Sequence, residues 1–493
     1  MSVHLPILRS LLTAPFREAV VDDARSYRGI EMVVAAANLA REIDRVCDTP
    51  TVGVLLPTSG ASPIAFLACW MSGRVPVPLN YLLKQDELDV IVEDCGTDTV
   101  LAVNLLLDHM GYQPKVPNVL KVDELSLKRV PPVKWPETFG EGDLGTLLYT
   151  SGTSGVPKGV ELTHGNLAAG VRIARQHIDL SPTGDVFLGV LPQFHCFGLI
   201  DLTLLPLTLG CKVVYSARFV PTKIVQKMRD HRPTIMIAIP SMFNALLGMK
   251  SAKPEDFASL RLCVSGGEPL PDAVAKKFEN RFGVTIAEGY GMTETSAGVN
   301  ICRPQEYRPH SVGPAMPDVR QRVVCTESGR DLPPGVDGEL RVAGPTIMRG
   351  YKGRPEETSR AFDERGFLRT GDMARQDTDG HVYITGRLKE MMIVGGENLF
   401  PREVEEVVNK APGVARSACI PRKDPNRGEV PIVFVEMEED AEFDEAAIRS
   451  FARESLAPYK VPREVHRLDA IPLGPTGKVL RRELTPPEAM PSS

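Results

Sequence analysis

A chain of 493 residues is too long for a single compact domain, so about two or three lobes are expected. Apolar residues make up 43% of the chain and charged residues 24%, which is ordinary for a globular enzyme. The net charge of −6 argues against a broad basic surface, and therefore against nucleic acid as a partner, although it leaves room for a small local basic patch.

The cysteines and the apolar runs indicate a reducing compartment and no membrane span. The nine cysteines are dispersed and include no C-x-x-C pair, which predicts free thiols. The apolar run from Leu5 to Leu12 is a poor signal peptide, because Arg9 interrupts it and no small-residue cleavage site follows. The run from Gly198 to Gly210 is shorter than the roughly 18 apolar residues of a membrane helix, and it contains Asp201. We therefore expect a cytoplasmic protein without an integral membrane segment, which leaves peripheral membrane association open.

Strand-like and helix-like segments alternate over the first two-thirds of the chain. Such alternation predicts an α/β lobe of doubly wound, largely parallel sheets. The expected strands are 52–56, 99–103, 144–149, 186–190, 213–215, 234–239, 260–264 and 284–287. The expected helices include 31–46, 166–177, 222–231, 241–249 and 272–282.

The pattern changes from about Val312 onward. Short strands separated by glycine and proline turns predict a small antiparallel barrel or sheet, with strands at 321–325, 339–342 and 381–384. A compact α+β pattern follows, with helices at 401–409 and 445–456 and strands at 415–420 and 431–436. We predict an N-terminal domain of residues 1–386, a hinge at 387–389 and a small mobile C-terminal domain of residues 390–493, whose last residues fray.

The glycine-rich segment Y-T-S-G-T-S-G-V-P-K-G at 149–159 directly follows an apolar strand. Glycines allow backbone amides to approach an anion and to point inward as a nest, while the hydroxyls and Lys158 add donors and positive charge, which suits a polyphosphate. The segment is not a Walker loop, because no Gly-Lys-Ser/Thr follows at the required spacing. A flexible linker is disfavoured by the concentration of these side chains after a buried strand. The predicted phosphate contacts are Thr150, Ser151, Gly152, Thr153, Ser154, Gly155 and Lys158.

This segment resembles the signature of the adenylate-forming superfamily, which contains acyl-CoA synthetases, peptide-synthetase adenylation domains and beetle luciferases. Further matching segments follow in the family's order and extend from about residue 145 to about residue 482. The resemblance implies an enzyme that uses ATP and Mg²⁺ to adenylate a small carboxylic acid and then passes the acyl group to a thiol, with coenzyme A (CoA) as the expected acceptor. It is compatible with a monomer or a homodimer.

The resemblance assigns several segments to the nucleotide. The loop S-G-G-E-P-L at 265–270 would pack against adenine, and E-G-Y-G-M-T-E-T at 288–295 offers the aromatic ring of Tyr290; either could also be an ordinary turn. The segment R-T-G-D at 369–372 is expected to precede a β-hairpin with Asp379-Gly380 at its turn. Within it, Asp372 would accept hydrogen bonds from both ribose hydroxyls, a task for a charged acceptor. The nucleotide contacts implied beyond the phosphate loop are Gly267, Glu268, Pro269, Glu288, Gly289, Tyr290, Gly291, Met292, Thr293, Asp372, Ile384, Arg387 and Lys478.

The implied catalytic groups surround the phosphates. Glu294 is a hard oxygen ligand suited to Mg²⁺, and Thr150 is the second expected metal contact. The C-terminal segment P-L-G-P-T-G-K-V-L-R-R at 472–482 resembles the family's loop with a catalytic lysine, here Lys478. No general base is required, because the acid is already ionised near neutral pH. The implied catalytic set is Lys478, His195, Thr293 and Glu294.

The second half-reaction is assigned to a rotation of the C-terminal domain. Lys389 falls at the family's hinge position. The segment G-G-E-N-L-F-P at 395–401 would line the pantetheine channel, where two glycines leave space for a thin chain. Relatives with other acceptors carry bulkier residues at the first of these positions, so Gly395 favours CoA. The predicted channel residues are Gly395, Gly396 and Glu397.

The acid is assigned to a mostly apolar pocket. The segment L-P-Q-F-H-C-F-G-L at 191–199 resembles the family's acid-binding segment, with His195 beside the carboxylate, although a lone histidine is more often structural. Apolar walls favour a medium- or long-chain fatty acid. An aryl-CoA ligase, an enzyme that loads a carrier-protein thiol and an inactive nucleotide-binding homologue are the alternatives. The predicted pocket comprises His195, Phe197, Leu199, Ala238, Ile239, Gly266 and Gly291.

Overall fold

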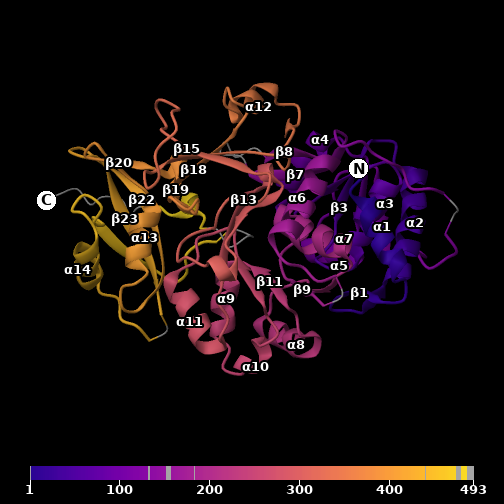
Figure 1. The fold of residues 1–493 in the computed structure, drawn as a ribbon, viewed down its shortest axis with the longest axis horizontal. Coiled ribbons are helices and arrows are strands. Elements are labelled where there is room, and N and C mark those ends of the chain that lie inside the picture. Colours follow the sequence, from indigo (N-terminus) through magenta and orange to yellow (C-terminus); the bar gives the residue numbers. More distant parts are fainter. Residues whose placement is uncertain are drawn as a thin grey trace.

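The chain runs from an α/β region at one end of the molecule to a smaller α+β region at the other end (Figure 1). The computed structural model of the protein describes residues 2–131, 134–151, 157–182, 184–438, 440–473 and 479–485. Among these residues, no helix is long and apolar enough to cross a membrane.

The N-terminal end contains a four-stranded parallel sheet in the order β4-β3-β5-β6. All residues of α3 except Ala61 are buried, because this helix is apolar on every side. The strands are β3 (Thr51–Leu55), β4 (Val75–Pro78), β5 (Thr99–Ala102) and β6 (Asn118–Lys121). The helices of this region are α1 (His4–Thr13), α2 (Gly29–Val46), α3 (Ala61–Met71), α4 (Gln85–Cys95) and α5 (Asn104–Met110).

An eight-stranded sheet forms the centre of the molecule, in the order β14-β13-β12-β11-β9-β10-β1-β2. Its six inner strands are parallel, and the two edge strands are antiparallel to their neighbours. The strands are β1 (Glu18–Val21), β2 (Ser26–Arg28), β9 (Val186–Gly189), β10 (Lys212–Tyr215), β11 (Ile235–Ala238), β12 (Leu262–Ser265), β13 (Ala287–Met292) and β14 (Ala297–Ile301). The carboxyl ends of parallel strands meet at one edge, which is where ligands bind in open α/β sheets.

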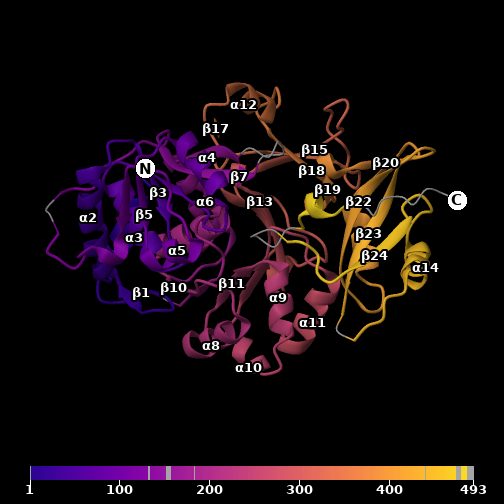
Figure 2. The same cartoon turned by 180° about the vertical axis from the view of Figure 1, so that it is seen from behind.

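Helices connect the strands of this central sheet. Figures 1 and 2 show α8 to α11 gathered on one side of it, at the bottom of both views. A π-type helix, η2 (Phe197–Leu204), follows β9 and leads directly into α7. The helices are α6 (His164–His177), α7 (Leu205–Leu209), α8 (Pro221–His231), α9 (Pro240–Leu247), α10 (Pro254–Phe257) and α11 (Asp272–Phe282).

Two smaller antiparallel sheets accompany the central one. Strand β17 (Gly350–Tyr351) pairs with β8 (Pro157–Thr163), which pairs with β7 (Leu144–Ser151), so that residues far apart in the sequence form one three-stranded sheet. Helix α12 (Pro355–Ala361) follows β17. The predicted antiparallel unit is a four-stranded sheet of β15 (Arg320–Val324), β16 (Gly338–Ala343), β18 (Leu368–Gln376) and β19 (Val382–Arg387).

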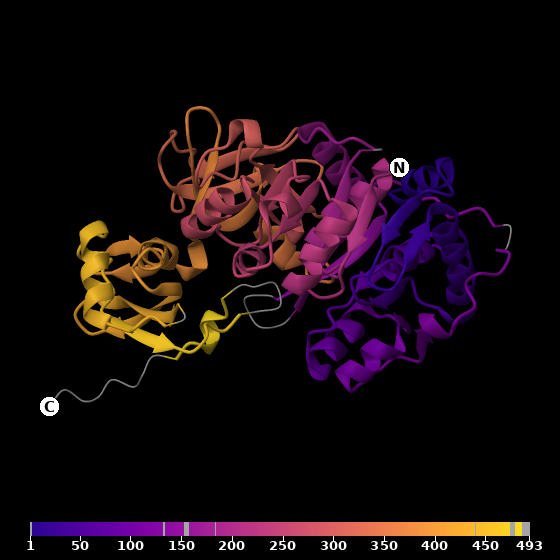
Figure 3. The same cartoon turned by 90° about the horizontal axis from the view of Figure 1, so that it is seen from below.

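The C-terminal elements form a group of their own beside the rest of the chain (Figure 3). They have a separate apolar core, to which Met392, Val404 and Ile448 belong. This group contacts α11, where Lys410 forms an ion pair with Asp272 at 3.1 Å. Its elements are β20 (Met392–Val394), β21 (Glu397–Leu399), α13 (Pro401–Val408), β22 (Val414–Asp424), β23 (Gly428–Met437), α14 (Glu445–Ser455) and β24 (Glu464–Leu468).

Mixed α/β architecture with a large N-terminal part and a small C-terminal part is confirmed, and two local predictions were wrong. Residues 284–286 lie outside any strand, and the strand begins at Ala287 and runs through the motif that was expected to follow it. The segment 369–372 was expected to precede a hairpin, but it lies within β18. Both segments contain glycines, which are typical of turns. In the structure, pairing with neighbouring strands keeps the backbone of both segments extended.

Two buried histidines connect α1 to the start of α6. The rings of His4 and His164 lie 6.3 Å apart between centroids, and the His164 ring stacks on Phe139 at 4.4 Å. Both histidines are fully buried. Burial lowers the pKa of each imidazole to about 4, so both are neutral at neutral pH.

These lowered pKa values predict a loss of stability at mildly acidic pH. In the unfolded chain both imidazoles bind a proton with a pKa of 6.5, whereas in the folded protein they stay neutral down to about pH 4. Their contribution to the free energy of unfolding is therefore fully present above pH 6.5 and is lost as the pH falls toward 4. At pH 5 each histidine should lower the free energy of unfolding by roughly 2 kcal/mol. Urea unfolding at pH 7.5 and pH 5 measures this loss, and His4→Phe should remove about half of it. Equal losses in the variant and the wild type would contradict the assignment.

Candidate active site

The loop 265–270 and the segment after His195 meet at the carboxyl edge of the central sheet. The loop begins at the end of β12, and Gly267 within it has a φ of +83°, a conformation that favours glycine. A Cβ at Gly266 would lie 2.9 Å from the Phe197 ring, so the ring packs directly on this glycine. Ile239, at the end of β11, lies within 4 Å of the Cβ position of Gly267. The structure therefore brings together four of the residues predicted for the acyl pocket and the adenine loop.

Asp372 is the buried centre of a polar cluster. One of its carboxylate oxygens accepts a hydrogen bond from the Tyr290 hydroxyl at 2.7 Å, and the other pairs with Arg387 Nε at 2.9 Å. Asp372 is 3% exposed and lies opposite Arg387 in the β18–β19 register. Burial and the neighbouring carboxylate raise the pKa of Tyr290, and the same carboxylate raises the pKa of Arg387. These three residues were all predicted to contact the nucleotide, and they form one hydrogen-bonded group. Tyr290 and Asp372 lie 82 positions apart in the sequence.

Removal of the Asp372 carboxylate should weaken ATP use selectively. In Asp372→Ala, Arg387 and Tyr290 lose their partner, and the ribose would lose the charged acceptor that the resemblance assigns to it. We expect kcat/KM for ATP to fall roughly 10- to 100-fold, the cost of a lost hydrogen bond to a charged group, while KM for the acid changes little. Asp379→Asn, on the exposed turn of the same hairpin, is the matched control. An equal rise of KM for ATP and for the acid would contradict the assignment.

Glu294 and Lys158 are connected through Tyr351. The Tyr351 hydroxyl donates a hydrogen bond to Glu294 Oε1 at 3.0 Å, and Lys158 Nζ lies 5.3 Å from the centroid of the same ring. Lys158 lies opposite Thr150 in the β7–β8 hairpin and forms an ion pair with Glu357 on α12. Tyr351 and Glu357 were not predicted, because only the pairing of β17 with β8 brings them to the phosphate segment.

Part of the predicted phosphate site lies outside the described residues. This holds for Gly152, Thr153, Ser154, Gly155 and the catalytic candidate Lys478, so their positions stay predictions. The described residues on either side of this gap make their own contacts. Leu473 forms a β-bridge with Val479, and Arg481 pairs with Glu405 at 2.9 Å and with Glu390 at 3.3 Å.

The His195 segment adjoins Thr293. The Thr293 hydroxyl contacts Cys196 Sγ at 3.7 Å, and the Phe197 amide contacts His195 Nδ1 at 3.4 Å. The π-helix η2 was not predicted from the sequence, because its mostly apolar residues show no helical period. Leu199 and Ala238, both predicted for the acyl pocket, have no exposed surface.

Glu288 connects the adenine loop to the C-terminal elements. Its carboxylate accepts a hydrogen bond from the Leu270 amide at 3.3 Å, and burial raises its pKa to about 7, an effect opposed by nearby Arg402 of α13. Arg402 also donates a hydrogen bond to the Ile384 carbonyl. The remaining predicted contacts lie along β13 (Gly289, Gly291 and Met292) and in the 265–270 loop (Glu268 and Pro269).

The predicted hinge and CoA-channel residues follow β19 directly. Lys389 lies in the short helix η5 (Leu388–Glu390). Gly395 and Gly396 have φ values of +62° and +90° and form the turn between β20 and β21, with Glu397 opposite Val394. This turn explains the need for two glycines, because other residues rarely adopt such values.

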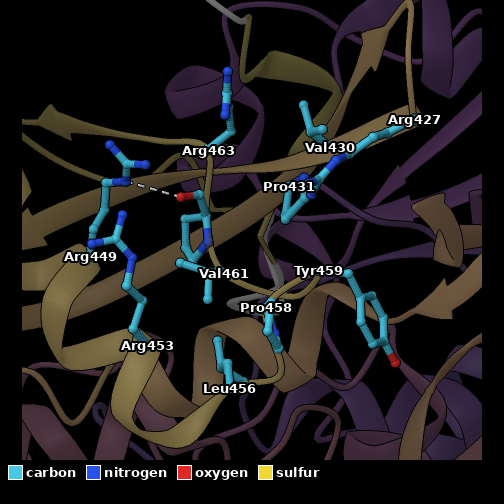
Figure 4. Close-up of a pocket in the computed structure, with 11 residues that line it drawn as sticks. Arg427, Val430, Pro431, Arg449, Arg453, Leu456, Pro458, Tyr459, Val461 and Arg463 are labelled. Atoms are coloured by element: carbon cyan, nitrogen blue, oxygen red, sulfur yellow. Dashed lines mark hydrogen bonds between the residues drawn. The ribbon is translucent and has the colours of Figure 1, made fainter. Parts of the chain in front are cut away.

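Figure 4 shows a groove of about 370 Å³ that is lined by several arginines. The carbonyl of Arg427, one of its lining residues, accepts a hydrogen bond from the Gly395 amide at 2.8 Å. Arg449 Nε donates to the Pro462 carbonyl at 3.1 Å, which fixes the loop that forms one wall. The other polar lining residues are Arg453, Tyr459 and Arg463, and the lining contains no carboxylate. Sequence reasoning missed the groove, because its arginines are separated along the chain and only the fold gathers them.

Comparison with known proteins identifies the family. Residues 9–352 match the AMP-binding enzyme family, and residues 403–478 match the AMP-binding enzyme C-terminal domain. The sulfoacetate–CoA ligase of Cupriavidus necator is 35% identical over 451 residues, covering 88% of this chain and 87% of its own. A feruloyl-CoA synthase of an Amycolatopsis species is 34% identical over 443 residues, covering 88% of both chains. The long-chain-fatty-acid–CoA ligase of Bacillus subtilis is 30% identical over 483 residues, covering 88% of this chain and 84% of its own.

Solved structures agree with this family over nearly the whole chain. ATP-bound MatB from Rhodopseudomonas palustris superposes with a TM-score of 0.88 at 28% identity, covering 98% of both chains. The o-succinylbenzoate CoA synthetase MenE from Bacillus subtilis, in complex with its acyl-adenylate intermediate, gives 0.87 at 27% identity with the same coverage. The chain therefore belongs to the AMP-binding enzyme family and is an ATP-dependent, AMP-forming acyl-CoA ligase of the adenylate-forming superfamily.

Proposed function

We propose that the protein activates an apolar carboxylic acid, in the first place a medium- or long-chain fatty acid, as its acyl-adenylate and transfers the acyl group to CoA. The observation that carries this proposal is that three groups adjoin the segment 288–295. Tyr290 of this segment belongs to the Asp372–Tyr290–Arg387 cluster, and Glu294 belongs to the Glu294–Tyr351–Lys158 chain. The third group is the apolar contact of Phe197 with Gly266, whose Cβ position lies 3.4 Å from the Gly289 carbonyl oxygen.

In the first half-reaction, a carboxylate oxygen attacks the α-phosphorus of ATP. The bond to the β-phosphate breaks, and pyrophosphate leaves. Two anions must approach each other, so the main requirement is positive charge held in place beforehand. Lys158 would contact the outer phosphates, and Lys478 would bridge the carboxylate and the α-phosphate. Asp372 would hold the ribose through its hydroxyls.

The residues fit a magnesium ion bound together with the phosphates. Glu294 offers a carboxylate and Thr150 a hydroxyl, and a single carboxylate combined with phosphate oxygens is the usual way in which proteins hold Mg²⁺. The Tyr351 hydroxyl donates a hydrogen bond to Glu294 Oε1. When bound, Mg²⁺ would neutralise charge on the phosphates; Tyr351 would orient the Glu294 carboxylate toward it.

In the second half-reaction, the thiol of CoA attacks the acyl carbon and releases AMP. We propose that the C-terminal domain, residues 390–493, rotates about Lys389, withdraws Lys478 and places the Gly395–Gly396 turn at the active site. The arginine groove then offers a site for the phosphates of CoA, while the Tyr459 ring suits its adenine. The hydrogen bond between Gly395 and Arg427 joins the channel turn to the groove, which favours CoA over a carrier-protein thiol.

The groove can be tested without altering adenylation. The double variant Arg453→Ala/Arg463→Ala should raise KM for CoA roughly 10-fold, the cost of lost charged hydrogen bonds, with unchanged KM values for ATP and the acid. The double variant should raise KM for dephospho-CoA, which lacks one phosphate, by a smaller factor than KM for CoA. Arg467→Ala, an exposed arginine on β24, is the control. An unchanged KM for CoA would rule out the groove as the site of its phosphates.

The chemistry of the acyl walls favours an apolar acid over one with a second anionic group. Phe197, Ile239 and Gly266 are apolar, and the walls predicted from the sequence include no lysine or arginine. Glu268 and Glu288 lie in or beside the adjoining loop and would repel a sulfonate or a second carboxylate. An aryl acid is the second candidate, because the flat ring of Phe197 lies at this wall and feruloyl-CoA synthases are among the relatives.

Pyrophosphate release with a panel of acids tests the substrate class. The panel contains octanoate, dodecanoate and hexadecanoate, ferulate and cinnamate, and sulfoacetate and malonate. The proposal predicts the highest kcat/KM among the fatty acids. The aryl acids would be favoured if the second candidate is right, and a preference for sulfoacetate or malonate would contradict an apolar pocket.

A further inference from the structure

Asp201 is a buried carboxyl group that the proposed mechanism does not use. It lies in η2 and is 7% exposed, and its Oδ2 has no hydrogen-bond partner among the described residues. A buried polar group without a partner costs roughly 1–3 kcal/mol, so its presence calls for an explanation. Apart from Asp201 and Thr203 the helix is apolar, and a leucine at position 201 would not carry this cost.

Helical periodicity places Asp201 on the same side of η2 as Phe197. A π-helix has a little over four residues per turn, so Asp201 lies one turn after Phe197 on the same side. Phe197 packs on Gly266 in the predicted acyl wall. The other sides of η2 are occupied: Ile200 faces Gly170 of α6, and the Thr203 hydroxyl contacts the Tyr215 hydroxyl at 3.0 Å.

The electrostatic environment of Asp201 suits a neutral polar ligand group. Burial raises the pKa of its carboxyl to about 7, and no cation offsets this effect. Near neutral pH the group is therefore present in both protonation states, and it can either donate or accept a hydrogen bond. A hydroxyl group can do the same, and it enters an apolar pocket at a much lower desolvation cost than an ammonium group.

We propose that Asp201 is a specificity-determining residue that hydrogen-bonds a hydroxyl group carried by the acid at a distance from its carboxylate. This inference rests on the proposed function and narrows its substrate class to hydroxylated apolar acids, either hydroxy-fatty or phenolic. A site built to bond a hydroxyl discriminates against the analogue that lacks it, because the buried carboxyl is then left without a partner.

Matched pairs of acids test this role. The pairs are dodecanoate with 12-hydroxydodecanoate, hexadecanoate with 16-hydroxyhexadecanoate, and cinnamate with 4-hydroxycinnamate. In the wild type, the hydroxylated member of at least one pair should have a kcat/KM about 10-fold higher or more. Asp201→Leu should abolish this preference by lowering activity with the hydroxylated acid and raising it with the plain one. Asp201→Asn should keep part of the preference, and the exposed Asp179→Asn should keep all of it.

Thermal unfolding separates this role from a structural one. Asp201 Oδ2 has no hydrogen-bond partner within the described chain. Asp201→Leu and Asp201→Asn should therefore unfold at or above the unfolding temperature of the wild type. Equal changes for both members of every pair, lower unfolding temperatures, or a preference for 12-aminododecanoate would overturn the proposal. If no acid of either kind releases pyrophosphate, the proposed function itself fails; if plain and hydroxylated acids react equally well, only the role of Asp201 fails.

Discussion

Replacement of Lys478 by alanine is expected to slow adenylation by orders of magnitude and to leave thioester formation from preformed acyl-adenylate intact. The lysine would stabilise charge that concentrates between the carboxylate and the α-phosphate, and removal of one such preorganised donor costs on the order of 100- to 1,000-fold. In the second half-reaction the acyl-adenylate already exists, so this charge is not formed again.

Two assays on the same preparation measure the two half-reactions separately. Pyrophosphate exchange in the presence of acid reports the first half-reaction, and acyl-CoA formation from synthetic acyl-adenylate reports the second. Lys250→Ala, at an exposed position after α9, should leave both rates unchanged. If Lys478→Ala lowered both rates by the same factor, the lysine would not be specific to adenylation.

Proline at position 389 should produce the opposite pattern. Proline fixes φ near −65° and restricts the residue before it, so the backbone at the hinge could no longer rotate between two conformations. We expect adenylation to be retained within a few-fold and thioester formation to fall by about two orders of magnitude or more, because conformational gating then limits the rate.

The same two assays measure the effect at the hinge. Lys389→Ala is the control, since it removes the side chain and leaves the backbone free to rotate. The ion pair of Arg481 with Glu390, which lies in the same short helix, should persist in both variants. Loss of both half-reactions in Lys389→Pro, or retention of both, would place the hinge elsewhere.

Local structure was predicted well where the sequence has a clear period and clear ends. Helix α11 runs over the predicted residues, because apolar positions recur at helical spacing and Gly283 ends it in the left-handed conformation. The strand at Ala287–Met292 was misplaced, because Gly289 and Gly291 suggest a turn, whereas β12 and β14 pair with this segment on both sides. The π-helix at Phe197–Leu204 has no periodic signal at all.

The candidate site was predictable only where a motif carries the information. Asp372, Tyr290 and Arg387 were predicted separately from their motifs, and the structure adds their hydrogen bonds. Tyr351 and Asp201 have no local signal, since the significance of Tyr351 depends on strand pairing and that of Asp201 on burial of its Oδ2 without a partner in the described part of the chain. The arginine groove likewise depends on the tertiary structure, because β23, α14 and the loop after α14 each contribute part of it.

The central claim is that one active site joins an apolar acid to AMP and then to CoA. Its most direct test is mass-spectrometric quantification of all nucleotides and acyl products after incubation of the protein with ATP, Mg²⁺ and the best acid of the panel, with and without CoA. The account predicts acyl-adenylate and pyrophosphate when CoA is omitted, and equal amounts of AMP and acyl-CoA when it is present. Formation of ADP and phosphate, or AMP without any acyl-adenylate or thioester, would contradict it.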